Sequence, residues 1–137
     1  MTGAGYSGTP LPRKLGIRPG ARVALLGAPE GARALLEPLP EGAQVTERLS
    51  PGLDVMVLFA DRRADLARRV PRAQAAMRPD TGLWVAWPKR ASGVPTDITE
   101  DVVRALGLAA GLVDNKVCSI DATWSGLRLV VRLRDRA

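Results

Sequence analysis

Short, uninterrupted runs of apolar residues recur along the chain and are separated by segments with helical periodicity. The strongest runs are residues 23–26, 54–59 and 83–87, and none of them alternates between apolar and polar positions. Such runs are typical of strands that are covered on both faces. A weaker strand is predicted at 43–46. Strands that alternate with helices in this way predict a mostly parallel sheet with helices on both faces.

The segments between the strands carry helix signals. Short helical segments are expected at 11–16 and at 32–37, the second stopped by Pro38. After the strand at 54–59, Asp61 is placed to cap a longer helix, which Pro71 should kink or split. The apolar face of that helix repeats at helical spacing and consists of Leu66, Val70, Ala73 and Met77.

A second long helix is expected after residue 97. Asp97 and Glu100 stand three residues apart, which is the spacing of a capping box, and Gly111 is placed to end the helix. Its buried stripe is predicted to be Ile98, Val102, Leu106 and Ala109.

The chain closes with two further strands, around 113–120 and 127–133. The link between them is short, so they should form an antiparallel hairpin. Together these elements predict one small Rossmann-like α/β domain of about six strands over residues 11–137. Residues 1–10 are small and polar, and we expect a flexible arm there, with Tyr6 on it.

Composition narrows the class of protein. The 137 residues are enough for a single core, and 46% hydrophobic and 25% charged residues are ordinary for a folded domain. No apolar run is long enough for a membrane helix, and residues 1–6 lack the layout of a signal peptide, so we expect a cytoplasmic protein. Histidine is absent and Cys118 is alone, which excludes an internal disulfide and argues against acid–base catalysis and a cysteine metal site. Within its strand, Cys118 is expected to be a buried apolar residue.

The net charge of +6 permits nucleic-acid binding. The candidate cations are Arg128, Arg132, Arg134 and the arginines of the helix after Asp61. The alternative interpretation is a solvated helix surface.

The most promising site is the loop of residues 87–97, which follows the strand at 83–87. Ligands of open parallel sheets bind outside the carboxyl ends of the strands, and the start of the next helix favours anions. The residues expected to bind an anionic ligand there are Trp87, Lys89, Arg90, Ser92, Gly93, Thr96 and Asp97. In the alternative interpretation, Asp97 caps the helix, Lys89 pairs with Asp97 or Glu100, and Trp87 belongs to the core.

The segments 14–23 and 77–85 resemble those that lead into two strands of S-adenosylmethionine-dependent methyltransferases, and the final helix and hairpin resemble the end of that fold. The resemblance implies the strand order 2-1-3-4-6-5 and S-adenosylmethionine as a possible cofactor. It places the cofactor against Gly27, Glu30 and Gly31 after the first strand and against Glu47 after the second. Pro29, which has no amide to donate, departs from the family's glycine-rich turn.

The whole chain also resembles a bacterial family of unknown function, the one numbered three thousand and fifty-two. The residues that carry this likeness are 6–11, 87–97, 113–118 and 123–125. It implies a shared fold and no particular activity.

Three functions follow as hypotheses. The first is a non-catalytic binding or regulatory module that uses the 87–97 loop for an anionic small molecule or a protein partner. The second is a minimal S-adenosylmethionine-dependent methyltransferase-like enzyme, and the third is a basic nucleic-acid-binding protein.

Overall fold

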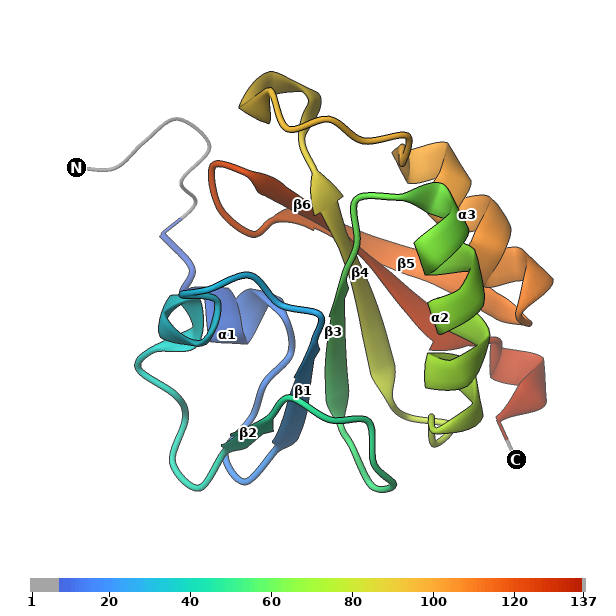
Figure 1. Cartoon of the computed structure of the whole chain (residues 1–137). Helices are drawn as coiled ribbons and strands as arrows, with labels where there is room; N and C mark the ends of the chain where they lie inside the picture. Colours follow the sequence, from blue (N-terminus) through green and yellow to red (C-terminus); the bar gives the residue numbers. More distant parts are fainter. Residues whose placement is uncertain (1–7, 137) are drawn as a thin grey trace.

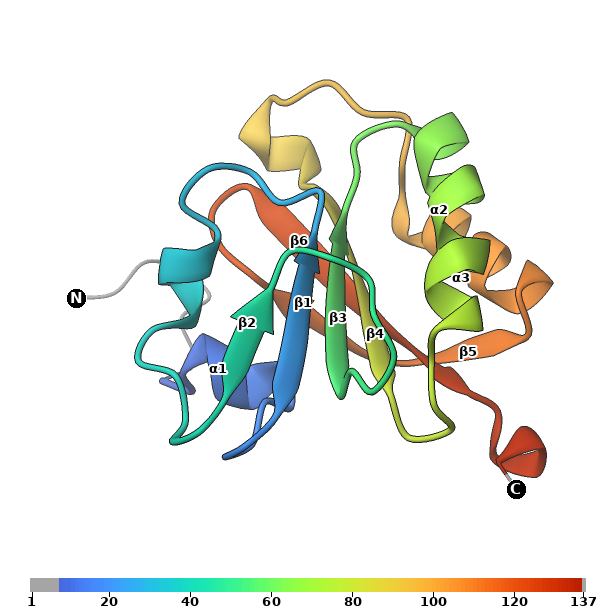
Figure 2. The same cartoon turned by 60° about the horizontal axis from the view of Figure 1, so that its bottom comes forward.

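The computed structural model describes residues 8–136, which form a six-stranded sheet with helical segments on both faces (Figure 1). The strand order is β2-β1-β3-β4-β6-β5, as the resemblance implied. Four strands are parallel and lie side by side in Figure 2: β1 (Arg22–Leu26), β2 (Gln44–Thr46), β3 (Val55–Phe59) and β4 (Gly82–Pro88). The predicted hairpin is also present, because β6 (Trp124–Val131) runs antiparallel to both β4 and β5 (Leu112–Ser119).

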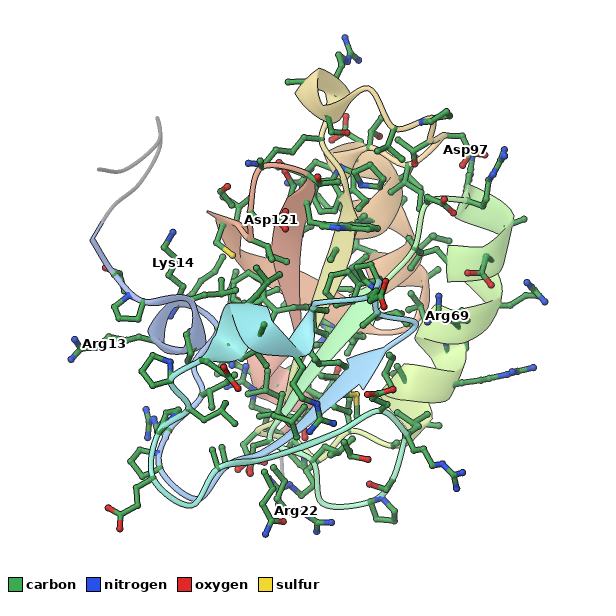
Figure 3. All side chains as sticks on the ribbon, turned by 60° about the vertical axis from the view of Figure 1, so that its left-hand side comes forward. Arg13, Lys14, Arg22, Arg69, Asp97 and Asp121 are labelled. Atoms are coloured by element: carbon green, nitrogen blue, oxygen red, sulfur yellow. The ribbon has the colours of Figure 1, made fainter. Side chains whose placement is uncertain are left out.

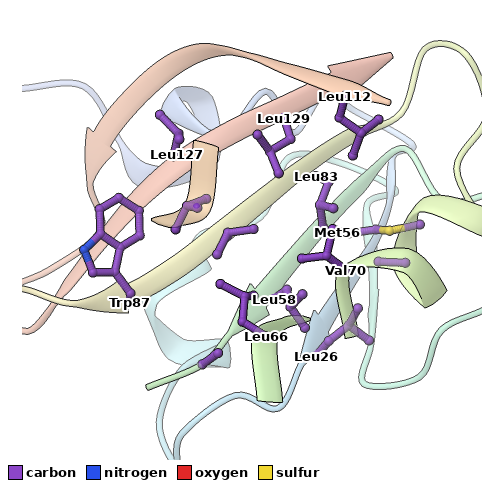
Figure 4. Packing of buried hydrophobic residues seen from close by; sticks show 14 of the residues in the cluster. Leu26, Met56, Leu58, Leu66, Val70, Leu83, Trp87, Leu112, Leu127 and Leu129 are labelled. Atoms are coloured by element: carbon purple, nitrogen blue, oxygen red, sulfur yellow. The ribbon is translucent and has the colours of Figure 1, made fainter. Parts of the chain in front are cut away.

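Two helices, α2 (Arg63–Ala75) and α3 (Glu100–Ala109), cover one face of the sheet. The strands beneath them are apolar without interruption, and every residue of β3 and of β4 is buried. Figure 4 shows the resulting core, in which leucines of β3, β4 and β6 meet Leu66 and Val70 of α2. Burial of this continuous apolar surface is the main favourable term that holds the two layers together.

Within residues 8–136, the other face carries only short helical segments, α1 (Leu11–Lys14) and η1 (Arg33–Leu36). They pack with Leu15, Val57 and Trp84 in a second core cluster. The indole Nε1 of Trp84 donates a hydrogen bond to the carbonyl oxygen of Leu15 at 3.0 Å, which ties the segment after α1 to the centre of the sheet. Two further short segments are η2 (Arg90–Ser92) and η3 (Leu133–Asp135).

The structure corrects three details of the predicted helices. Pro71 lies inside α2 without splitting it, because the proline is exposed and the apolar face of the helix stays packed on the sheet. No side chain at the start of α2, Asp61 included, caps it from its own loop. In α3, Ala109 is exposed, and Val103 and Gly107 are the buried positions.

The predicted N-terminal arm falls mostly outside the described residues, Tyr6 included. Within residues 8–136, no helix has the length and apolar character needed to cross a membrane.

Candidate functional site

The carboxyl ends of β1, β3 and β4 lie at one edge of the sheet, at the top of Figure 1. The chain passes from β1 to β2 on one side and then returns to β3 on the other side of β1. Strand order therefore reverses between β1 and β3, and this switch point is where open α/β sheets bind their ligands. Gly27 directly follows β1 here, and Ala60 directly follows β3.

Arg69 of α2 lies over this switch point (Figure 3). Its Nη1 donates hydrogen bonds to the carbonyl oxygen of Phe59 at 2.8 Å and to Asp65 Oδ2 at 3.0 Å. A Cβ built on Gly27 would collide with the Arg69 guanidinium in this position, and the φ of +64° at Gly27 also favours glycine. The side chain is 24% exposed, which makes Arg69 a partly buried cation at the centre of the crevice.

Sequence reasoning missed Arg69 because it grouped this residue with the other arginines of the helix. The one available signal was Asp65, placed four residues earlier, at the spacing of a helical ion pair. That spacing recurs throughout solvated helices, so it does not single out a cation at a crevice.

A groove of about 210 Å³ opens beside Arg69. It brings together two of the four residues to which the resemblance assigned the cofactor, Gly27 and Glu47. Glu47 lies 3.6 Å from Arg33 in an exposed ion pair, whereas Glu30 and Gly31 are exposed on the loop and do not line the groove. The full lining is Leu26, Gly27, Glu47, Leu49, Leu58, Arg69, Arg72 and Ala73.

The 87–97 loop follows β4 at the same edge. Trp87 is only 7% exposed and packs in the core under α2 and α3, as the alternative interpretation predicted. Ser92 Oγ donates to the carbonyl oxygen of Lys89 at 2.7 Å and accepts from the amide of Val94 at 3.1 Å. Lys89 Nζ donates to Ser119 Oγ at 2.5 Å, and not to Asp97 or Glu100. Most of the polar side chains expected to hold a ligand are therefore bound within the protein.

Asp97 has a different role from the one predicted. Its Oδ1 accepts a hydrogen bond at 2.6 Å from the amide of Arg63, the first residue of α2, instead of capping the helix that follows it. Thr99 is the N-cap of α3 and accepts from the amide of Val102 at 3.2 Å. Thr96 supports the same bridge to α2, because its Oγ1 donates to the carbonyl oxygen of Asp61 at 2.7 Å.

Arg90 and Gly93 are the two predicted residues of this loop that are exposed and make no side-chain hydrogen bond or ion pair within residues 8–136. Gly93 has a φ of +77°, which forms the turn after η2. Ligand binding by the 87–97 loop thus stays a prediction that rests on few free groups.

Other chemistry finds little support in the part of the chain that the structure describes. Residues 8–136 contain no cluster of three or more acidic or cysteine side chains that could hold a metal ion. Cys118 is half-buried in β5, and burial raises the pKa of its thiol. A raised pKa lowers the thiolate fraction at neutral pH, so the expectation of an apolar packing residue fits its surroundings better than that of a nucleophile.

No family model and no curated protein sequence matches the chain, so the resemblance to the bacterial family of unknown function stays a prediction. Solved structures do match. Mitomycin 7-O-methyltransferase has a TM-score of 0.64 and 16% identity, over 82% of this chain and 49% of that one. An O-methyltransferase from neocarzinostatin biosynthesis, in complex with S-adenosylmethionine and 2-hydroxy-5-methyl naphthoic acid, has a TM-score of 0.64 and 16% identity, over 94% and 51%.

The present chain thus spans about half the length of these two enzymes. It spans most of a third, an S-adenosylmethionine-dependent methyltransferase from Aquifex aeolicus, with a TM-score of 0.61 and 15% identity over 88% of this chain and 87% of that one. Identities this low establish the fold alone. The chain has the Rossmann-like fold of S-adenosylmethionine-dependent methyltransferases.

Proposed function

We propose that this chain is a methyltransferase-like protein that binds S-adenosylmethionine in the groove between β1 and β3. One observation carries the proposal: Gly27, after β1, and Glu47, after β2, line a single groove at the switch point of the sheet. The structural neighbours also favour this function over the non-catalytic module that the sequence suggested first.

The residues of the groove suit the nucleoside part of this cofactor. The Glu47 carboxylate would accept hydrogen bonds from the ribose hydroxyls, as an acidic residue near the end of the second strand does in related folds. Leu26, Leu49 and Leu58 supply apolar surface for the adenine ring. When bound, S-adenosylmethionine supplies a methyl group for transfer.

The volume of the groove matches S-adenosylmethionine less well than the chemistry of its lining residues does. Pockets for ligands of this size usually measure roughly 300–1,000 Å³, and the groove measures about 210 Å³. Arg69 fills the region over Gly27. Binding of the whole cofactor therefore requires the Arg69 side chain to leave the Phe59 carbonyl oxygen, after which its guanidinium would pair with the cofactor's carboxylate.

Isothermal titration calorimetry with S-adenosylmethionine and S-adenosylhomocysteine tests the proposal. Glu47→Ala removes the carboxylate from the groove, and Glu30→Ala removes the same charge from the neighbouring loop without touching the groove. Charge-assisted hydrogen bonds contribute about 1.5–3 kcal/mol, so Glu47→Ala should weaken binding about tenfold to a hundredfold. Glu30→Ala should leave it unchanged.

Absence of binding to the unmodified protein would refute the proposal, and so would equal losses in the two variants. Turnover is a separate question. If the protein binds S-adenosylmethionine but forms no S-adenosylhomocysteine with a panel of small nucleophiles, the domain is a cofactor-binding module without catalysis.

A further inference from the structure

A second cavity lies at the opposite edge of the sheet, where the parallel strands begin. Its volume is about 590 Å³, which is within the range typical of small-molecule sites. It shares no residue with the groove beside Arg69. The lining comes from the segment between α1 and β1, from the residues at the start of β3 and before β4, and from both strands of the hairpin: Lys14, Leu15, Gly16, Arg18, Pro19, Gly20, Ala21, Asp54, Val55, Asp80, Lys116 and Arg128.

Four cations line this cavity: Lys14, Arg18, Lys116 and Arg128. Among residues 8–136, the side chains of these four make no hydrogen bond or ion pair with another residue. Arg69 and Arg104, which lie elsewhere in the protein, each have a carboxylate partner. The cavity thus gathers positive charge that the fold leaves without counter-ions.

The two carboxylates that line the cavity are already bound to another cation. Arg78 forms ion pairs with both Asp54 and Asp80. The other oxygen of Asp54, Oδ2, accepts a hydrogen bond from the amide of Arg22 at 2.8 Å. Arg78 offsets one of these two negative charges, so the four cations of the lining remain in excess.

Arg128 is partly buried, unlike the exposed Arg18 and Lys116. It is directly paired with Trp84 of β4 and with Lys116 of β5, so these three side chains share one face of the sheet. The absence of a side chain at Gly82 makes room for it, because a Cβ there would lie 2.6 Å from Arg128 Nε. Burial, together with the nearby charge of Arg136, lowers the pKa of Arg128. A partly desolvated cation without a partner gains from an approaching anion, which replaces the lost hydration.

We propose that this cavity binds a small, multiply charged oxyanion, such as a phosphorylated metabolite or a polycarboxylate. Lys116 and Arg128 on the hairpin would meet the anion together with Lys14 and Arg18, which precede β1. The planar guanidinium of Arg128 suits bidentate contact with phosphate or carboxylate oxygens. The cavity's size limits the ligand to a small molecule, and the unpaired charges set its sign.

Titration calorimetry with pyrophosphate and with citrate, at about 0.15 M ionic strength, tests this site. Lys14→Gln and Arg13→Gln form a matched pair, because Arg13 is the adjacent exposed cation, does not line the cavity and points in a different direction (Figure 3). Lys116→Gln removes an exposed cation from the cavity with little risk to folding. Arg128→Met keeps most of the aliphatic length and removes the charge.

We expect pyrophosphate, citrate or both to bind to the unmodified protein, and the stronger of the two identifies the ligand class. Each of the three cavity variants should weaken binding about tenfold or more, and Arg13→Gln should leave it within about twofold. Failure of both anions to bind would overturn the proposal, as would equal losses in Lys14→Gln and Arg13→Gln. Binding of single-stranded oligonucleotides that exceeds both anions and weakens equally in those two variants would point instead to nucleic acid and would also overturn it.

Discussion

The bridge from Asp97 to the start of α2 gives the sharpest test of the structure. Asp97→Ala removes the acceptor for the Arg63 amide, which lies 2.6 Å from Oδ1. That amide is one of the free N–H groups at a helix start, and loss of such an acceptor costs about 1 kcal/mol. A chain of 137 residues has an unfolding entropy near 0.3 kcal/mol/K, so we expect the melting temperature to fall by about 3–4 °C.

The location of the effect distinguishes the structure from the capping box expected from the sequence. Amide hydrogen exchange followed by NMR should show faster exchange at Arg63 in Asp97→Ala and unchanged exchange at Val102. Thr99→Ala should show the reverse, because Thr99 Oγ1 accepts from the Val102 amide. Asp97→Asn keeps an oxygen acceptor and should lose less stability than Asp97→Ala. If Asp97→Ala instead speeds amide exchange in the first turn of α3 and leaves exchange at Arg63 unchanged, the hydrogen bond from the Arg63 amide to Asp97 is refuted.

Three further predictions follow from the packing and burial of single residues. Gly107→Ala should destabilise the protein by about 1–2 kcal/mol in urea denaturation, because the new Cβ would lie 2.8 Å from Leu129 Cδ2. This loss should exceed the gain from the better helix propensity of alanine. Unchanged stability would show that the core can adjust. Trp84→Phe should cost about 1–3 kcal/mol because it leaves the buried carbonyl oxygen of Leu15 without its donor, and a smaller loss would mean that water replaces the indole. Burial raises the pKa of the Cys118 thiol, so iodoacetamide should react more slowly with the native than with the denatured protein at neutral pH. The stabilisation by the neutral thiol is fully present below the unfolded pKa of about 8.5. It should disappear as the pH rises through the higher pKa of the native state.

The sheet could be predicted largely from the sequence. Residues 23–26, 55–59 and 83–87 are apolar without alternation, and this pattern is decided locally, because a strand buried on both faces has no solvent side for polar residues. The short link between the last two strands likewise restricts them to an antiparallel hairpin. Gly111 ends α3 as expected, with a φ of +85° that glycine adopts without strain.

The partners of polar side chains could not be predicted in the same way. Asp97 has the spacing of a cap for its own helix, yet it binds Arg63, which is 34 residues earlier and close only because β3 and β4 are neighbours. Trp87 was expected to contact a ligand, yet its side chain lies in the core. The partner of a polar side chain depends on which backbone groups or charged side chains the folded chain brings near it. The spacing of residues along the sequence does not contain that information.

In both candidate sites, the sequence determined the local elements and the tertiary structure determined which side chains lie together. The sequence by itself determined the strands and the hairpin, because apolar periodicity and turn chemistry act over a few residues. The acidic and glycine residues after β1 and β2 were named only by the resemblance to methyltransferases, and their role in binding stays a prediction. Only the tertiary structure decided that Arg69 lies over Gly27 at the switch point and that Lys14, Lys116 and Arg128 line one cavity. These groups are far apart in sequence, and crossover connections and strand register, which follow from burying the whole sheet, bring them together.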